Sequence, residues 1–151
     1  MEQKDIKFLE QLLYNTDKSF VVNQLSSIEK PLLLHGFAFN YNWNNGFDIP
    51  KIILANQNCD LGTGLLMFHY ADGYRMLENS DEVLNSSSEE WKEFLMETYN
   101  KVLNLNFKSQ NISFEPELTK IQKYKLKKNN PNIPDVFINK SPGKMVNIPE
   151  I

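Results

Sequence analysis

The chain has 151 residues, of which 41% are hydrophobic and 23% charged, a composition that fits a globular protein and excludes the disordered and fibrous classes. A chain of this length usually forms one domain around one hydrophobic core, which we expect over residues 1–151. Cys59 is the only cysteine, so an intrachain disulfide is excluded and a reducing compartment is favoured. The start of the sequence lacks the pattern of a signal peptide, and no apolar run approaches the roughly 18 residues of a membrane helix. We therefore expect a cytoplasmic protein that is not embedded in a membrane.

The formal net charge of −3 conceals an uneven distribution of charge along the chain. Residues 1–100 contain 15 acidic and 7 basic residues, whereas residues 101–151 contain 4 acidic and 9 basic ones. Almost all of the basic residues are lysines, and Arg75 is the only arginine. Because arginine supplies the bidentate contacts that are typical of nucleic-acid recognition, we do not expect nucleic acid as a partner. The acidic first part of the chain favours a basic partner instead.

Periodic apolar residues and capping side chains predict four helices in the first part of the chain. The three-to-four spacing of apolar residues over residues 5–14 is typical of an amphipathic helix. Asp17 would cap a second helix, and Pro31 would end it and open a third over residues 32–41. After an Asn-rich turn, a short fourth helix is expected over residues 48–56.

Capping residues also indicate where the later helices begin. Asp60 is expected to cap a fifth helix, which would break near Gly73. Ser87 and Glu90 have the spacing of a capping box and predict the start of the longest helix, which would end near residue 103. Pro116 would open a last helix that extends to residue 128.

The segment 130–151 contains four prolines and is predicted to be irregular. Its apolar residues Val136, Phe137 and Ile138 predict that it packs on the helical body. The predicted fold is therefore a single compact all-α domain of six to seven helices with an irregular, Pro-rich C-terminal tail. The Asn-rich turns followed by short helices are similar to those of helical solenoids.

Few side chains in the sequence suit catalysis or metal binding. Cys59, His35 and His69 could act as a nucleophile or as soft metal ligands, but their spacing matches no zinc pair and no known catalytic dyad. We therefore expect no catalytic residues, no metal site and no cofactor. One alternative is a small hydrolase that uses Cys59 with a histidine, or two of the three carboxylates of Asp48, Asp60 and Asp72. Another is a structural or nucleic-acid accessory protein that uses the lysines of residues 120–128.

The stretch of residues 37–47 is the most informative part of the sequence, because asparagines interleave with five aromatic residues: Phe37, Phe39, Tyr41, Trp43 and Phe47. A helix can bury only one face, so we expect some of these rings to lie at a surface or groove, with Tyr41 and Trp43 as the candidates. The competing interpretation is that all five rings pack inward.

Three ordered runs of residues carry a resemblance to a known family. They read YNWNNGFDIP over residues 41–50, NCDLGT over residues 58–63 and ADGYR over residues 71–75. Together they resemble a group of uncharacterised bacterial proteins that form the family named domain of unknown function 4274, over about residues 32–103. The resemblance implies a bacterial cytoplasmic protein, and it supplies no catalytic residues because the family has no established activity.

The leading hypothesis from the sequence is a non-enzymatic binding protein, and more specifically an immunity protein that neutralises a cognate toxin. Small size, an acidic first part and the lack of a catalytic motif suit that role. Complementary charge would speed the encounter with a basic toxin domain. The residues that we expect to contact the partner are Tyr41, Trp43, Asp48, Asp60 and Asp72.

Overall fold

The computed structural model describes residues 1–151, and it contains helices, turns and two long irregular segments but no strand. An isolated parallel bridge between Ile112 and Lys144 is the one β-type pairing. The all-α prediction is confirmed, with more helices than expected. In chain order they are α1 (Gln3–Leu13), α2 (Lys18–Ser27), α3 (Pro31–Asn40), the 3-10 helix η1 (Trp43–Asn45), α4 (Asp48–Ala55), α5 (Leu61–Tyr70), α6 (Tyr74–Glu78), α7 (Ser80–Leu84), α8 (Glu89–Leu103), α9 (Lys120–Asn129) and η2 (Asp135–Phe137).

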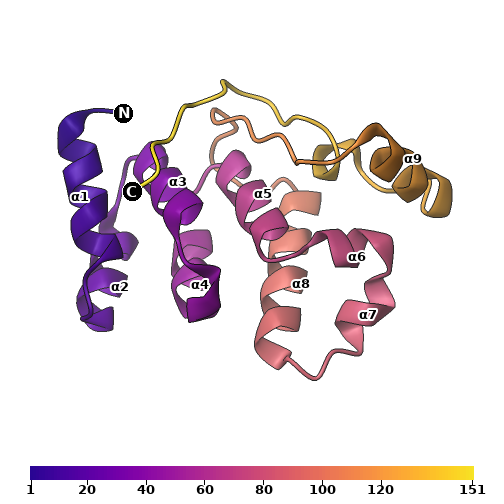
Figure 1. Ribbon diagram of the computed structural model, residues 1–151, viewed down its shortest axis with the longest axis horizontal. Coiled ribbons are helices and arrows are strands. Elements are labelled where there is room, and N and C mark those ends of the chain that lie inside the picture. Colours follow the sequence, from indigo (N-terminus) through magenta and orange to yellow (C-terminus); the bar gives the residue numbers. More distant parts are fainter.

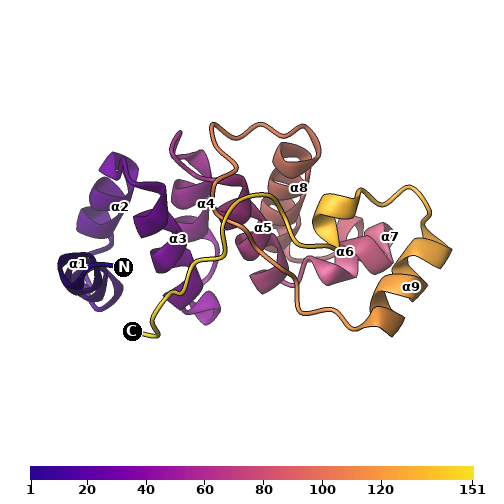
Figure 2. The same ribbon diagram turned by 90° about the horizontal axis from the view of Figure 1, so that it is seen from above.

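The helices stand in a row of neighbouring pairs. Helix α3 packs between α1 and α5, while α2 packs against α4 and α5 packs against α8. Figure 1 shows these pairs side by side from α1 and α2 at one end to α5 and α8, with α6, α7 and α9 at the other end. Seen from above in Figure 2, the same order holds along the long axis of the molecule. None of the helices combines the length and the hydrophobicity that a membrane span requires.

Helix α5 is the centre of the hydrophobic core. Its residues from Leu61 to Phe68 are all buried, because α3 and α8 cover it on two sides and the segment after α8 covers its first turn. Burial on every side explains why the sequence of α5 is apolar or small throughout and shows no amphipathic period. A single cluster of 26 buried hydrophobic residues extends from Leu9 in α1 to Ile138 in the tail.

Two irregular segments, residues 104–119 and residues 138–151, run across the upper ends of the helices (Figure 1). They pair with each other where the Ser113 N–H donates to the Lys144 carbonyl (3.0 Å) and the Lys144 N–H donates to the Asn111 carbonyl (3.0 Å). The final segment then continues back over α5 and α3 toward α1 (Figures 1 and 2). Phe137 and Ile138 are 0% and 2% exposed, so both side chains lie in the hydrophobic core.

The carboxylate of Asp60 joins helix α5 to the segment above it. It accepts a hydrogen bond from the Gly62 N–H (2.9 Å), which caps α5 as predicted. Three further donors come from residues 109–112, namely the Ser109 hydroxyl (2.6 Å), the Asn111 N–H (2.7 Å) and the Ile112 N–H (3.1 Å). The residue is 0% exposed, so these four bonds replace the water that an ionised carboxylate would otherwise require.

Two predicted helix starts are wrong. Helix α8 begins one residue later than the predicted capping box requires, and its N-cap residue, Ser88, makes no side-chain capping bond. The last helix begins at Lys120, not at Pro116, because the side chains of Thr119 and Gln122 form the capping box. Ser87 with Glu90 and Thr119 with Gln122 have the same capping-box spacing, so spacing alone does not indicate which pair forms the box.

Helices α6 and α7 were not predicted. Each has five residues, which is too short for a periodic apolar pattern. Asp72 ends α5 with a left-handed backbone (φ 66°), although Gly73 was the expected break. Gly73 itself has φ −64°, and its role is steric, because a Cβ there would lie 2.5 Å from the Phe68 carbonyl oxygen.

Replacing Asp60 with Asn tests whether its carboxylate holds residues 109–112 on α5. We expect Asp60→Asn to lower the free energy of unfolding by about 2–4 kcal/mol, because an NH2 group would face donors that an oxygen now accepts. Asp17→Asn is the matched control, since Asp17 caps α2 at the surface with one bond, from the Phe20 N–H. Asn caps helices as well as Asp, so that change should stay within about 0.5 kcal/mol. Urea unfolding of both variants at pH 7 measures the difference, and equal losses would contradict the assignment.

Candidate functional site

The five residues that the sequence suggested as partner contacts do not form one surface. Tyr41 and Asp48 line a common cavity, Trp43 packs beside it on Phe94, Asp60 is buried under the segment after α8, and Asp72 lies at the end of α5. The surroundings of Tyr41, Trp43 and Asp60 indicate a local structural role for these three residues.

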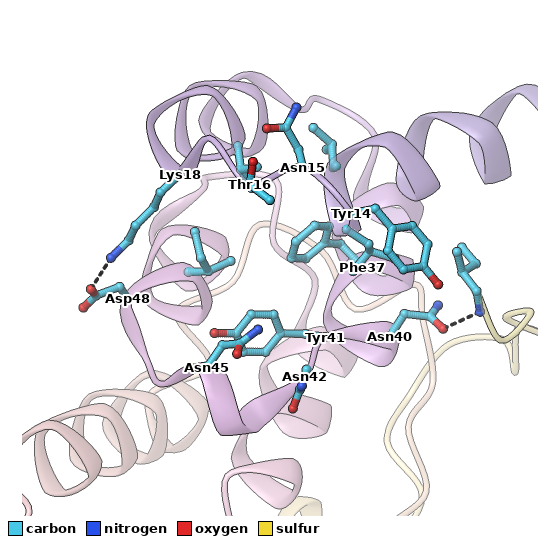
Figure 3. A pocket seen from close by; sticks show the side chains of 15 residues that line it. Tyr14, Asn15, Thr16, Lys18, Phe37, Asn40, Tyr41, Asn42, Asn45 and Asp48 are labelled. Atoms are coloured by element: carbon cyan, nitrogen blue, oxygen red, sulfur yellow. Dashed lines mark hydrogen bonds and ion pairs between the residues drawn. The ribbon is translucent and has the colours of Figure 1, made fainter.

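The cavity beside Tyr41 has a volume of about 440 Å³ and lies between the α1–α2 turn, the end of α3, the start of α4 and Ile151 (Figure 3). This volume is in the range of small-ligand and side-chain pockets. Its inner wall is apolar and is formed by Leu12, Leu13, Val21, Phe37, Ile49 and Ile151. Uncharged polar side chains surround the opening, from Tyr14, Asn15, Thr16, Asn42 and Asn45. A site of this kind would take an apolar group that is flanked by hydrogen-bonding atoms.

An ion pair closes one side of the cavity. Lys18 Nζ lies 2.5 Å from Asp48 Oδ2, and both side chains are largely exposed (Figure 3). Lys18 begins α2 and Asp48 begins α4, and because these helices pack side by side their first turns are neighbours. The hydrogen bond from Lys18 lowers the pKa of the Asp48 carboxyl. A carboxylate at the start of α4 also opposes the positive end of the helix dipole.

Tyr41 and Trp43 belong to a network of packed rings. The Tyr41 hydroxyl donates to the Gly46 carbonyl (2.8 Å), and burial raises its pKa to about 12. The Trp43 ring meets Tyr41 edge-on, with centroids 5.3 Å apart, and lies 5.9 Å from the ring of Phe94. Its indole N–H is buried and makes no hydrogen bond. Phe37 is in the core and the other four rings of the stretch are partly buried against it. Trp43 and Phe47 contact Phe94 of α8, and Phe39 contacts Tyr70 of α5, so the rings serve mainly to pack this stretch on α8 and α5.

Asp60 and Asp72 differ in their exposure. Asp60 has no surface to offer a partner, and its four bonds make it a structural residue, so it is removed from the set of contact residues. Asp72 is exposed and its Oδ2 lies 2.9 Å from Arg75 Nε. Arg75 also approaches Glu82 (3.4 Å), which links the end of α5 to α7.

The strongest concentration of negative charge was not singled out from the sequence. Residues 78–97, which cover the end of α6, α7 and most of α8, contain seven acidic residues and one basic residue, Lys92. We call this surface the acidic edge; its members are Glu78, Asp81, Glu82, Glu89, Glu90, Glu93 and Glu97, all of them exposed. Ion pairs bind three of them, to Arg75, Lys92 and Lys51, which leaves Glu78, Asp81, Glu90 and Glu97 without a cation. The excess of acidic residues before residue 100 was the signal that could have located it.

The side chains that suited catalysis are buried in separate surroundings. Cys59 is 1% exposed, and burial raises the pKa of its thiol to about 12. His35 Nδ1 is hydrogen-bonded to Thr63 Oγ1 (2.9 Å), and the His69 Nε2–H donates to the Phe137 carbonyl (2.9 Å). Burial lowers the pKa of both imidazoles to about 4. No group of three or more His, Cys, Asp or Glu side chains is placed to hold a metal ion.

The buried histidines make stability depend on pH. Their pKa values fall from 6.5 to about 4 on folding, so between these pH values the unfolded chain binds more protons than the folded one. The contribution of the two neutral histidines to stability should therefore be fully present above pH 6.5. The free energy of unfolding should fall by about 2 kcal/mol per histidine by pH 5. His69→Gln, whose amide can still donate to the Phe137 carbonyl, should remove about half of this pH dependence. Urea unfolding at pH 7 and pH 5 measures both effects, and a wild-type protein equally stable at both would refute the argument.

Cys59 should behave as a structural thiol. Because its pKa is raised and its sulfur is covered, we expect alkylation by iodoacetamide at pH 7.5 to be at least about a hundredfold slower in the folded protein than in urea. Mass spectrometry of timed samples gives both rates. Fast labelling of the folded protein would instead indicate an activated nucleophile.

Comparison with known proteins bears on the middle of the chain. Neither the curated proteins nor the solved structures include a match to this sequence. Residues 29–103 match the family model described as a domain of unknown function (DUF4274), which agrees with the resemblance found in the three sequence runs. The match extends from the residues just before α3 to the end of α8, and so includes the aromatic stretch, Asp60 and the acidic edge. This part of the chain belongs to the family of domain of unknown function 4274.

Proposed function

We propose that this chain is a non-enzymatic bacterial binding protein of the cytoplasm, and more specifically an immunity protein that neutralises a basic toxin domain. The observation that supports the proposal is the acidic edge. Four exposed carboxylates without a cation lie on helices that are packed on the core. Carboxylates in this position can pair with the basic residues of a partner protein.

The helices hold these charges in a fixed arrangement. Phe94, Leu95, Thr98 and Val102 bury the inner face of α8, and Val83 buries that of α7, so the acidic face of each helix points outward. Leu84, the last residue of α7, is 42% exposed and offers an apolar contact beside the acidic residues of that helix. Charge around an apolar centre is the usual composition of a protein–protein interface, in which charge accelerates the encounter and apolar contact slows dissociation.

The competing hydrolase hypothesis gains no support from the site. A thiol whose pKa is raised to about 12 is almost entirely protonated at pH 7, and the thiol form is a poor nucleophile. Asp48, Asp60 and Asp72 each bond to different partners, which are Lys18, the residues around Ser109, and Arg75. These surroundings favour a binding function.

Co-expression tests the biological role. The proteins encoded by the reading frames adjacent to this one should include a basic protein whose expression arrests growth of a bacterial host, and expression of this chain should restore growth. Purified together, the two should elute as a complex in gel filtration. If no neighbouring product is toxic, or if this chain leaves a toxic neighbour active, the proposal fails.

Charge substitution tests the surface. We expect the quadruple variant Glu78→Gln, Asp81→Asn, Glu90→Gln and Glu97→Gln to lower the association rate with that basic protein by about tenfold or more at low salt, and to flatten its salt dependence. The control variant carries Glu10→Gln, Glu29→Gln, Glu115→Gln and Glu117→Gln. These four glutamates are exposed, form no ion pair and lie outside the acidic edge. Each variant loses four negative charges, so the two differ only in where the charges are removed. Equal rates for the two variants in stopped-flow measurements would place the interface elsewhere.

A further inference from the structure

Helix α9 carries an apolar and basic face that no other part of the chain covers. Ile121 and Tyr124 are 67% and 66% exposed, so most of each side chain meets solvent. Residues three and four positions apart lie on one side of a helix, so Lys125 and Lys128 continue the stripe that Ile121 and Tyr124 begin. We call this surface the basic face; its members are Lys120, Ile121, Tyr124, Lys125 and Lys128, all of them exposed.

The other side of α9 is bound to the body, and this turns the basic face outward. Leu126 is buried, while Lys127 donates to the Ile133 carbonyl (2.8 Å) and pairs with Asp135 (2.8 Å). Lys127 is the only residue of α9 that takes part in an ion pair. The three lysines of the basic face therefore have no anion within their own chain.

The acidic edge lies at the same end of the molecule as the basic face. Helix α9 packs on α6, and Figures 1 and 2 both show α6, α7 and α9 together at one end of the row of helices. The acidic edge has four carboxylates without a cation, and Leu84 is exposed at the end of α7. Each surface thus combines unpaired charge of one sign with exposed apolar side chains, and the two signs are opposite. Such surfaces attract each other and fix how two molecules are oriented.

We propose that the basic face binds the acidic edge of a second copy of this chain. Because both surfaces lie at one end of the molecule, a two-fold axis beside α6 brings the basic face of each copy onto the acidic edge of the other. A contact of this kind is made twice and closes on itself, so it yields a dimer and not a growing chain of molecules. Charge complementarity identifies the occupant, because one sequence supplies both of the matching surfaces.

The dimer is expected to be weak and sensitive to salt. Exposed ion pairs contribute little to net affinity and are screened by salt, and the apolar part of the contact consists of Leu84, Ile121 and Tyr124. A weak dimer covers the acidic edge only until a tighter ligand displaces the second copy. Competition between the second copy and a toxin is a consequence that rests on the proposed immunity function, whereas the dimer itself does not.

Sedimentation velocity of the wild-type chain tests self-association. Between about 5 µM and about 200 µM protein at low salt, the weight-average sedimentation coefficient should rise from that of a monomer toward that of a dimer. Addition of about 0.5 M NaCl should weaken the dimer by at least about tenfold, because it screens the charges of both surfaces. A coefficient that stays monomeric at the highest concentration would overturn the proposal, and so would a dimer that is indifferent to salt.

Charge reversal tests which surfaces meet. A first variant reverses the basic face, and a second variant reverses the acidic edge. Each alone should dimerise at least about tenfold more weakly than the wild type, because like charges then face each other in both halves of the contact. An equal mixture should restore dimers, because the reversed surfaces match each other and the unchanged surfaces match as before. The first variant carries Lys120→Glu, Lys125→Glu and Lys128→Glu, and the second carries Glu78→Lys, Asp81→Lys and Glu90→Lys.

A control variant reverses three exposed lysines outside the basic face, with the changes Lys7→Glu, Lys108→Glu and Lys144→Glu. Its dimer should stay within about threefold of the wild-type affinity, because salt screens charges that are far from the contact. Circular dichroism establishes that each variant is folded. If folded variants fail to form mixed dimers, or if the control weakens dimerisation as much as the first variant does, the proposal is overturned. No toxin is present in these experiments, so their outcome does not depend on the proposed immunity function.

Discussion

The buried carboxylate of Asp60 is the interaction on which the architecture depends. Helix α5 is covered on all sides, and its upper end is covered by a segment that has no regular structure of its own. Such a segment must find partners for its N–H groups, and Asp60 supplies them at Asn111 and Ile112. Gly62 makes the approach possible, since a Cβ there would lie 1.8 Å from the Ile112 carbonyl oxygen. The bridge to Lys144 is built on the same segment, so this capping residue also helps to place the tail.

The parts of the fold that could be predicted are those whose determinants are local. Helices α1 to α5 have apolar periods or caps within a few residues, and their predicted bounds agree with the structure to within a few residues at each end. The capping role of Asp60 was predicted, but its three bonds to residues 109–112 were not, because no sequence pattern reports a contact across about fifty positions. Helices α6 and α7 were missed for the opposite reason, since five residues hold too little periodic information.

The residues of the candidate site also divide into those that a local sequence pattern could select and those whose role depends on distant residues. Tyr41 and Asp48 could be selected because one stretch of sequence contains them, and the structure places both at one cavity. Asn40 lies next to Tyr41 but was not selected, because its side chain is hydrogen-bonded to Pro149 and Ile151, which are 109 and 111 positions away. A run of aromatic residues predicts extensive packing, but it does not indicate whether the rings pack on the protein's own core or on another protein. Here the partner of the rings is largely the protein's own core.

The separation of charge along the sequence persists in three dimensions. Eight ion pairs are formed, and seven of them join residues before residue 101; the eighth, Lys127 with Asp135, joins two residues after it. None connects the acidic first part to the basic last part. A chain selected for stability alone gains little from surface ion pairs, so their absence costs little in folding free energy. It does, however, leave the carboxylates on α7 and α8 without an ion pair to the lysines of α9. Charge of one sign at a surface accelerates the capture of an oppositely charged protein. Ion pairs thus do not link the acidic and basic parts of the chain, and this is the physical argument behind the proposal that the acidic edge binds a basic partner.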